Sequence, residues 1–481
     1  MTDTQPPFTG SELTRLQAHE VVELLRKGEV SPAELVDASL ARIEQVDGAV
    51  NAMPVVCADR ARAAANHMAG DVDHPGWLGG LPIGIKDLTP VEGVRTTFGT
   101  KFYADHVPDQ SDPLVCRLEA RGAIVMGKTN TPELGAGANT FNDVFGPTFN
   151  AYDTTLNAAG SSGGAAVSLA TGQVWLSQGS DHGGSLRTPA AYNGIVGLRP
   201  SPGRVPGSSD TAFGIEGVEG PMARSVTDCA LFLDAMSGFD ASSPLSYPAP
   251  DAPFQQAVAR ADGKLRIAFS DDLGGLSPVD ADMARYLRRA IDKVAANGAE
   301  IEETTPDLSG LERTYHTLRG LGMVALGRNA PAEMQQHFKQ TLCENIKLGQ
   351  TLSVNDVADA NLNRTKIYNE IRRLFSRFDV LACPVVGNLP RPQTQEWVRE
   401  VGGVELHGYM DWLRFAFLAT TAGLPAISVP VGLSDEGLPV GLQLIGPPRG
   451  EAVVLAAARA VEIAVGGPLP PRDPNVRSTA S

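Results

Sequence analysis

Two short turns rich in glycine and serine contain the residues whose types and spacing could do chemistry. The first reads Gly160-Ser161-Ser162-Gly163-Gly164, and the second, Ser180 to Ser185, reads Ser-Asp-His-Gly-Gly-Ser. Glycines beside a serine remove side-chain bulk and permit positive φ, so the backbone can approach a substrate and aim several N–H groups at one point. Such a group of donors stabilises a negatively charged oxygen. The run from Ala165 to Gly179 predicts a buried helix followed by a strand, which would fold the two turns back together.

A nucleophilic serine needs a base, and an upstream lysine is the better candidate. His182 lies inside the second turn, where its side chain is poorly placed to serve Ser185. Lys86 ends a short apolar run that contains Ile83, Gly84 and Ile85. Burial disfavours the ammonium form of a lysine and lowers its pKa, and a neutral amine can accept a proton. We therefore expect Lys86 to emerge from a buried strand into a nearly water-free site.

With these residues the chain resembles the amidase signature enzymes, a family of bacterial amidases, fatty acid amide hydrolases and the catalytic subunit of glutamyl-tRNA amidotransferases. Positions 86, 161 and 185 have the order and spacing of that family's lysine, bridging serine and nucleophile. Ala159 departs from the pattern, because the family usually has glycine two residues before the bridging serine. Other similar stretches are Thr129 to Leu134, Phe145 to Thr148, Gly197 to Pro200, Gly220 to Arg224 and Ala422 to Ala426.

The resemblance implies a role for each of these residues. Ser185 would be the nucleophile, Ser161 would relay its proton to Lys86, and the peptide bond before Ser161 would be cis. The oxyanion hole would consist of the backbone N–H groups of His182, Gly183, Gly184 and Ser185. The acyl pocket would be lined by Gly135, Ala136 and Gly137. The supporting residues, holding the turns by hydrogen bonds or an ion pair, would be Ser162, Asp181 and Arg187.

The implied activity is an amidohydrolase that cleaves a carboxylic amide through an acyl-enzyme on Ser185, with no metal or organic cofactor. Three alternatives stay open. The first turn also satisfies the G-x-S-x-G pattern of α/β-hydrolases with Ser162 as nucleophile, although no apolar strand precedes it. The chain could instead be an amidotransferase subunit that channels ammonia to a tRNA-linked substrate, or a non-catalytic binding protein on the same fold.

Composition excludes several other classes of protein. The 481 residues are 42% hydrophobic, and the formal net charge of −15 disfavours binding to nucleic-acid phosphates. No stretch reaches the roughly 18 uncharged apolar residues of a membrane span, and the N-terminus has no signal-peptide pattern. We expect a cytoplasmic protein whose partner is a small-molecule amide, with a homodimer left open. Neither disulfides nor zinc are expected from the five scattered cysteines, Cys57, Cys116, Cys229, Cys343 and Cys383.

Alternating strand and helix patterns predict an α/β fold, a single large domain with a central mixed sheet covered by helices on both sides. The expected helices are 11–27, 31–46, 58–69, 113–121, 280–296 and 451–465. The expected strands include 123–127, 265–270, 300–303, 378–384, 426–431 and 440–445. The expected divisions are a helical cover (1–72), a catalytic core (73–235), a variable substrate-side region (250–375) and a return to the core sheet (376–481).

Overall fold

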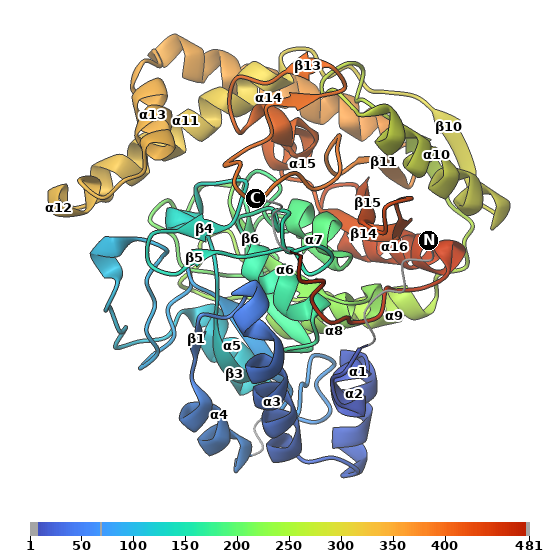
Figure 1. Ribbon diagram of the computed structural model, residues 1–481. Coiled ribbons are helices and arrows are strands. Elements are labelled where there is room, and N and C mark those ends of the chain that lie inside the picture. Colours follow the sequence, from blue (N-terminus) through green and yellow to red (C-terminus); the bar gives the residue numbers. More distant parts are fainter. Residues whose placement is uncertain (1–7, 68–69, 478–481) are drawn as a thin grey trace.

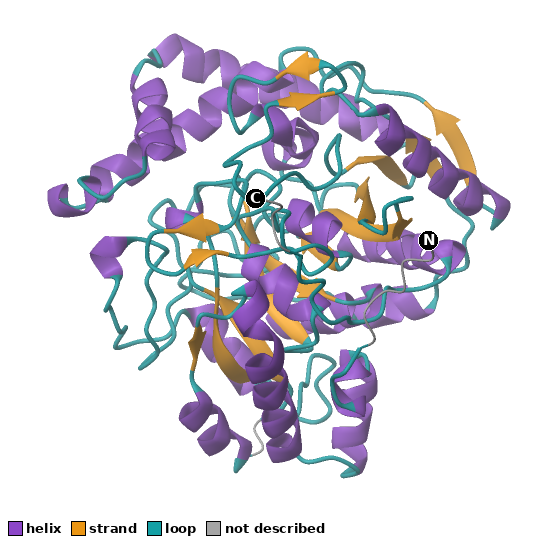
Figure 2. Ribbon diagram, in the orientation of Figure 1, coloured by secondary structure: helices purple, strands orange, loops and turns teal. Residues whose placement is uncertain are grey.

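The computed structural model describes residues 8–67 and 70–477. Its described residues form a mixed sheet of eleven strands with helices on both sides, which confirms the predicted α/β class (Figures 1 and 2). The strand order across the sheet is β1 (Val55–Val56), β3 (Ile124–Thr129), β2 (Pro82–Lys86), β6 (Leu176–Asp181), β8 (Val218–Ala223), β7 (Val196–Arg199), β14 (Ala426–Leu433), β15 (Pro439–Ile445), β11 (Val380–Pro384), β9 (Arg266–Phe269) and β10 (Glu300–Glu303). Two small hairpins are β4 (Phe141–Asn142) with β5 (Gly146–Pro147), and β12 (Glu400–Val401) with β13 (Val404–Glu405).

Strand pairing determines which chain segments meet at the edge of the sheet. Strand β2 runs parallel to β3 and to β6, with Ile83 opposite Leu176 and Gly84 opposite Ser177. All five residues of β2 are buried, as expected of an interior parallel strand that reads as an apolar run. Because parallel strands end at the same edge, Lys86 at the end of β2 emerges beside the turn that follows β6.

The helices pack around this sheet. The first half of the chain contains α1 (Glu12–Arg15), α2 (Ala18–Lys27), α3 (Pro32–Val50), α4 (Ala58–Ala65), α5 (Pro113–Ala120), α6 (Gly163–Ala170), α7 (Arg187–Asn193) and α8 (Val226–Met236). The second half contains α9 (Phe254–Ala259), α10 (Ala281–Ala296), α11 (Leu311–Asn329), α12 (Ala332–Gln335), α13 (Gln340–Gln350), α14 (Val354–Leu374), α15 (Phe417–Ala422) and α16 (Glu451–Val465). Short 3₁₀ turns are η1 (Lys101–Tyr103), η2 (Glu133–Gly135) and η3 (Asp411–Ala416). Figure 1 shows α11, α12 and α13 as an arm above the sheet. None of the described helices is long and apolar enough to cross a membrane.

The N-terminal helix differs from its prediction. Residues 11–27 form two helices, because Leu16 and Gln17 have extended backbone, and Gln17 is the N-cap of α2. The carboxylate of Asp228, on α8, accepts hydrogen bonds from the N–H groups of Ala18 and His19 at 3.0 and 2.9 Å. The Glu20 carboxylate also accepts the Gln17 N–H at 2.7 Å, so α2 has a local cap and a distant one. Residues 11–27 alone could not indicate the distant cap. The predicted helix 58–69 ends at Ala65, and residues 68 and 69 lie outside the described part of the chain.

Candidate active site

Lys86 is fully buried and contacts three serine hydroxyls. Its Nζ lies 2.7 Å from Ser161 Oγ, 2.8 Å from Ser162 Oγ and 3.0 Å from Ser180 Oγ. The neighbouring Asp87 turns away from this amine and instead receives hydrogen bonds from Thr97. The amine is thus surrounded by neutral oxygen atoms, which can exchange protons with it without holding it in the charged form.

Burial lowers the pKa of Lys86 to about 7, although the negative charges of Glu219 and Asp181 act in the opposite direction. Removing an ammonium group from water is costly, and hydroxyl groups compensate for this only in part. A substantial fraction of the Lys86 side chain is therefore a neutral amine near pH 7, which is the form that accepts a proton.

The turn that carries Ser161 has an unusual backbone. The Gly160–Ser161 peptide bond is cis, and Ala159 has a φ of 55°, in the left-handed region. That conformation costs an alanine roughly 1–2 kcal/mol, because its Cβ crowds the following carbonyl. The Thr140 hydroxyl holds the turn by donating to the Ala159 carbonyl at 2.8 Å and accepting from the Gly163 N–H at 3.2 Å. This position needs the conformation that favours glycine, and here an alanine adopts it.

The second serine turn lies directly against the first. The Ser162 N–H donates to the Ser185 carbonyl at 3.3 Å, so the helix and strand between the turns do bring them together. Ser185 itself is half-buried. Among the described residues, no hydrogen bond joins the Ser185 hydroxyl to Ser161. The structure therefore contains the Lys86–Ser161 contact. The two serine turns are joined by the backbone hydrogen bond between Ser162 and Ser185.

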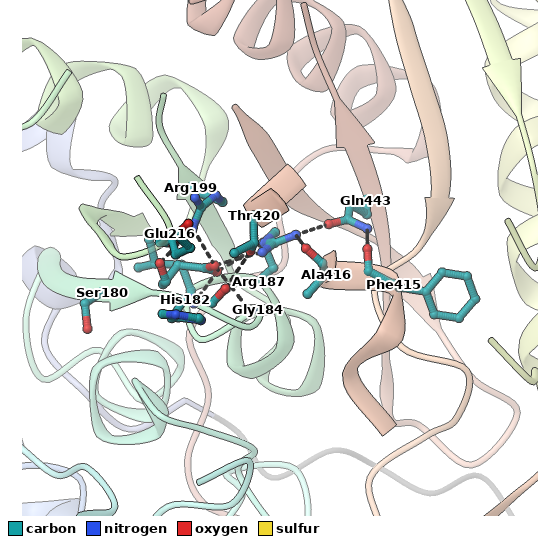
Figure 3. A network of polar contacts seen from close by, with 12 residues as sticks. Ser180, His182, Gly184, Arg187, Arg199, Glu216, Phe415, Ala416, Thr420 and Gln443 are labelled. Atoms are coloured by element: carbon teal, nitrogen blue, oxygen red, sulfur yellow. Dashed lines mark hydrogen bonds and ion pairs between the residues drawn. The ribbon is translucent and has the colours of Figure 1, made fainter. Parts of the chain in front are cut away.

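Asp181, the last residue of β6, holds the second turn in place. Its carboxylate forms ion pairs with Arg187 at 2.8 Å and with Arg199 at 3.3 Å. Figure 3 shows Arg187, Arg199 and Gly184 within this polar network. It also accepts the N–H groups of Gly184 and Leu186 at 3.2 and 3.0 Å. Burial raises the pKa of Asp181, but the two guanidinium groups outweigh burial and hold that pKa well below its usual range. The turn is therefore fixed by one buried carboxylate.

These contacts change which backbone groups are free to bind an oxyanion. The Gly184 N–H, one of the predicted donors, is already directed at Asp181. In the described chain the N–H groups of the other predicted donors, His182, Gly183 and Ser185, have no acceptor. Gly184 has a φ of 97°, and a Cβ on Gly183 would lie 2.8 Å from the Tyr315 hydroxyl, so both positions require glycine.

The side chain of His182 points toward an aromatic group and not toward a serine. Its Nδ1 lies 3.4 Å from the Tyr315 hydroxyl, and the Tyr315 ring stacks on Phe417 with centroids 3.7 Å apart. Burial lowers the pKa of His182 to about 4, and the positive charge of Arg319 lowers it further. Within the described residues His182 has no hydrogen bond to Ser185. The imidazole is a neutral part of the wall of the site.

The segment 135–137 forms another part of this wall. A Cβ built on Gly135 would lie 3.6 Å from Ser161 Oγ, and one on Gly137 would lie 3.1 Å from the Nζ of Lys339. Ala136, between them, is buried. The small residues therefore leave room beside Ser161 and bring Lys339 close to the site.

Sequence reasoning missed a second set of polar residues behind Lys86. The side chain of Gln178 accepts the Lys86 backbone N–H at 2.9 Å through Oε1, and its Nε2 donates to the Glu219 carboxylate and to Thr89. Burial raises the pKa of Glu219 to about 7. Gln178 and Ser180 are two residues apart on β6 and so share a face, a polar alternation that the sequence already contained.

One further group of side chains has a geometry that suits a metal ion. Ligand atoms of Glu312, His316 and Asp411 lie within 4.8 Å of one another. Arg414 forms ion pairs with Glu312 at 3.0 Å and with Asp411 at 3.1 Å, so a guanidinium already neutralises both carboxylates. A cleft of about 910 Å³ opens at this point, and none of the serine-site residues lines it.

Comparison with known proteins places this site in a family. A family model described as Amidase matches residues 34–455. The chain belongs to the amidase signature family. An acylamidase of Rhodococcus erythropolis is 33% identical and aligns over 94% of this chain and 96% of its own length. A glutamyl-tRNA(Gln) amidotransferase subunit of Moorella thermoacetica is 35% identical over 94% of this chain and 97% of its own length.

Solved structures agree with this assignment. A bacterial aryl acylamidase described as an amidase signature enzyme superposes with a TM-score of 0.85 at 29% identity, covering 95% of this chain and all of that one. A 6-aminohexanoate cyclic dimer hydrolase gives a TM-score of 0.83 at 26% identity, covering 94% and 98% of the two chains. Membership of the amidase signature family supports amide hydrolysis. The relatives include both an acylamidase and an amidotransferase subunit, so the comparisons do not distinguish these two reactions.

Proposed function

We propose that this protein is a serine amidohydrolase that cleaves a carboxylic amide through an acyl-enzyme on Ser185. The observation that carries the proposal is the buried Lys86 amine bonded to Ser161, in a turn packed against the turn of Ser185. Neutral Lys86 draws a proton through Ser161 from Ser185, whose oxygen attacks the amide carbonyl. The Gly183 and Ser185 N–H groups stabilise the resulting oxyanion.

The remaining steps restore Lys86, Ser161 and Ser185 to their starting protonation states. The tetrahedral intermediate collapses when the carbon–nitrogen bond breaks and Ser161 protonates the departing amine, while Lys86 returns its proton to Ser161 and the acyl group stays on Ser185. Water then attacks the ester and gives a proton through Ser161 to Lys86. As the ester carbon–oxygen bond breaks, that proton returns through Ser161 to Ser185, and the carboxylic acid is released. The pKa of Lys86 near 7 supports this assignment, since the same group must accept and donate a proton at neutral pH.

The amidotransferase subunit is the second candidate, supported by the relative from Moorella thermoacetica. In that case the chain would release ammonia from an amide and pass it to a partner, and the Ser185 chemistry would be the same. Activity of the purified chain alone on simple amides favours the amidohydrolase. Activity that depends on the addition of candidate partner proteins favours the amidotransferase.

The test of the shared chemistry is a nucleophile substitution. Ser185→Ala should abolish turnover of a panel of aryl, aliphatic and cyclic amides, and a fluorophosphonate should label wild type at Ser185 alone, as located by peptide mass spectrometry. Ser242→Ala, which replaces an exposed serine, is the matched control and should keep full activity and labelling. Turnover or labelling that persists in Ser185→Ala would rule out the proposed nucleophile.

A further inference from the structure

Arg319 is a buried arginine close to the site whose hydrogen-bond partners are neutral. The residue is 7% exposed. Its Nη1 donates to the Asn345 side chain at 2.6 Å, and its Nη2 donates to the hydroxyl of Tyr409. In the part of the chain that the structure describes, no carboxylate pairs with it. Burying a guanidinium without a counter-charge costs free energy, and the Arg319 guanidinium is buried in this way.

The position of Arg319 connects it to the serine turns. It lies about one helical turn after Tyr315 on α11, about 6 Å along the helix axis. Tyr315 faces Gly183 and His182, and Met410, next to Tyr409, also packs against Gly183. Thus both the helix that carries Arg319 and the segment that it bonds to touch the turn of the proposed nucleophile.

Neighbouring charges do not neutralise this guanidinium. Lys339 has its own partner in Glu396 at 3.2 Å, and the Glu216 carboxylate pairs with Arg364. Asp181 is shared by Arg187 and Arg199. Two of the five N–H donors of Arg319 are used by Asn345 and Tyr409, which leaves three for a ligand.

We propose that Arg319 binds a carboxylate of the substrate, so that the preferred substrates are amides carrying a carboxylate on the acyl or the amine side of the scissile bond. This inference rests on the proposed amidohydrolase function. The planar guanidinium matches a carboxylate in geometry and charge, and binding would supply the counter-charge that the buried side chain lacks. Arg319 is then a specificity-determining residue that touches the substrate away from the reacting bond.

Two matched pairs of amides test the proposal and distinguish the two sides. Succinamic acid against butyramide places the carboxylate on the acyl side, and N-acetyl-β-alanine against N-propylacetamide places it on the amine side. Wild type should prefer the acidic member of one pair in kcat/KM. Arg319→Met should lower kcat/KM for that acid by about 30-fold or more, mainly through KM, and change its neutral counterpart by less than about threefold. Arg319→Lys should keep part of the preference.

A control on the same helix separates binding from folding. Arg313→Met removes an exposed arginine that pairs with Asp356, and it should leave the preference unchanged. Equal loss on both members of a pair, or a wild type that prefers neutral amides, would overturn the proposal. If wild type hydrolyses none of the four amides, calorimetry of succinamate and butyramide binding decides. Binding of succinamate that is tighter than that of butyramide and that Arg319→Met abolishes supports the inference, and equal or absent binding refutes it. Ser185→Ala, inactive on all amides yet still binding succinamate, reports on the catalytic proposal alone.

Discussion

At the scale of single residues, one amine decides how the proposed reaction responds to pH. Only neutral Lys86 can take the proton from Ser161, and its pKa is about 7. We therefore predict that kcat/KM falls as the pH drops through about 7 and levels off above about 8, since protonation removes the base. Initial rates on one amide from about pH 5.5 to about pH 9 measure this. Lys86→Met should lose at least about 10³-fold in kcat/KM across that range, and a flat wild-type profile would contradict lysine as the base.

Glu219 should shift that profile. Its negative charge raises the pKa of Lys86, so Glu219→Gln should move the acidic limb of the kcat/KM profile to lower pH. The glutamine side chain can still accept a hydrogen bond from Gln178, which limits the change in structure. The exposed Glu300→Gln is the control and should leave the limb in place. If the acidic limb of the kcat/KM profile is unchanged or moves to higher pH in Glu219→Gln, the Glu219 carboxylate does not raise the pKa of Lys86.

Residue types and spacing predicted Lys86, Ser161 and Ser185, but not the residues behind them. Lys86 follows an apolar run, and the two serines stand in glycine-rich turns, so each carries a local signal. Glu219 reaches Gln178 only because β6 and β8 pair antiparallel with Ser180 opposite Glu219. That register depends on long-range pairing, which no local pattern contains. The resemblance implied the N–H groups of Gly183 and Ser185 as oxyanion donors, but no local pattern indicated that Asp181 takes the Gly184 N–H.

At the scale of elements, the turn after β6 depends on the buried Asp181 cluster. We predict that Asp181→Asn lowers the free energy of unfolding by roughly 3–5 kcal/mol, because Arg187 and Arg199 would be left without a buried counter-charge. Thermal midpoints of the variant and wild type at neutral pH test this. Asp435→Asn, which breaks exposed ion pairs with Arg285 and Arg289, should change the midpoint little. Equal midpoints for Asp181→Asn and wild type would exclude this role.

The same carboxylate has a defined pH dependence. The pKa of Asp181 in the folded protein lies below its unfolded value of about 3.9. Its stabilisation is therefore fully present above about pH 4 and is lost as the pH falls through the folded pKa. The difference in thermal midpoint between wild type and Asp181→Asn should accordingly stay constant from about pH 5 to about pH 8.

Elements with local signals were predicted well, and elements defined by distant partners were not. Helix α3 begins as expected, since Ser31 accepts the Glu34 N–H, Glu34 accepts the Ser31 N–H, and Pro32 occupies the first helical position. The start of α2, by contrast, is capped in part by Asp228 from α8, which is 210 residues away from Ala18. Strands β7 and β8 were noted only as similar stretches, because their glycines and prolines weaken a strand pattern that pairing within the sheet nevertheless enforces.

At the scale of the whole molecule, segments near both ends of the described chain meet on α3. The Asp473 carboxylate accepts hydrogen bonds from Thr9 at 2.7 Å and from Arg42 at 2.7 Å, and Arg42 also donates to the carbonyls of Thr171 and Arg472. No local pattern indicates this contact, since Arg42 and Asp473 are 431 residues apart. One buried arginine thus joins α3, the residue that follows α6 and the C-terminal segment of the described chain.

Replacing Asp473 should therefore weaken the molecule far from its site. Asp473→Ala leaves the guanidinium of Arg42, whose side chain is 1% exposed, without its carboxylate, and we predict a loss of roughly 2 kcal/mol in the free energy of unfolding. The kcat of the folded variant should match wild type, because no described residue of the two serine turns bonds to Asp473. Glu23→Ala, which removes an exposed ion pair with Arg26, is the control and should cost less than about 0.5 kcal/mol. Thermal midpoints and steady-state rates measure both effects. An unchanged midpoint in Asp473→Ala would mean that the terminal segments do not contribute to stability through Arg42.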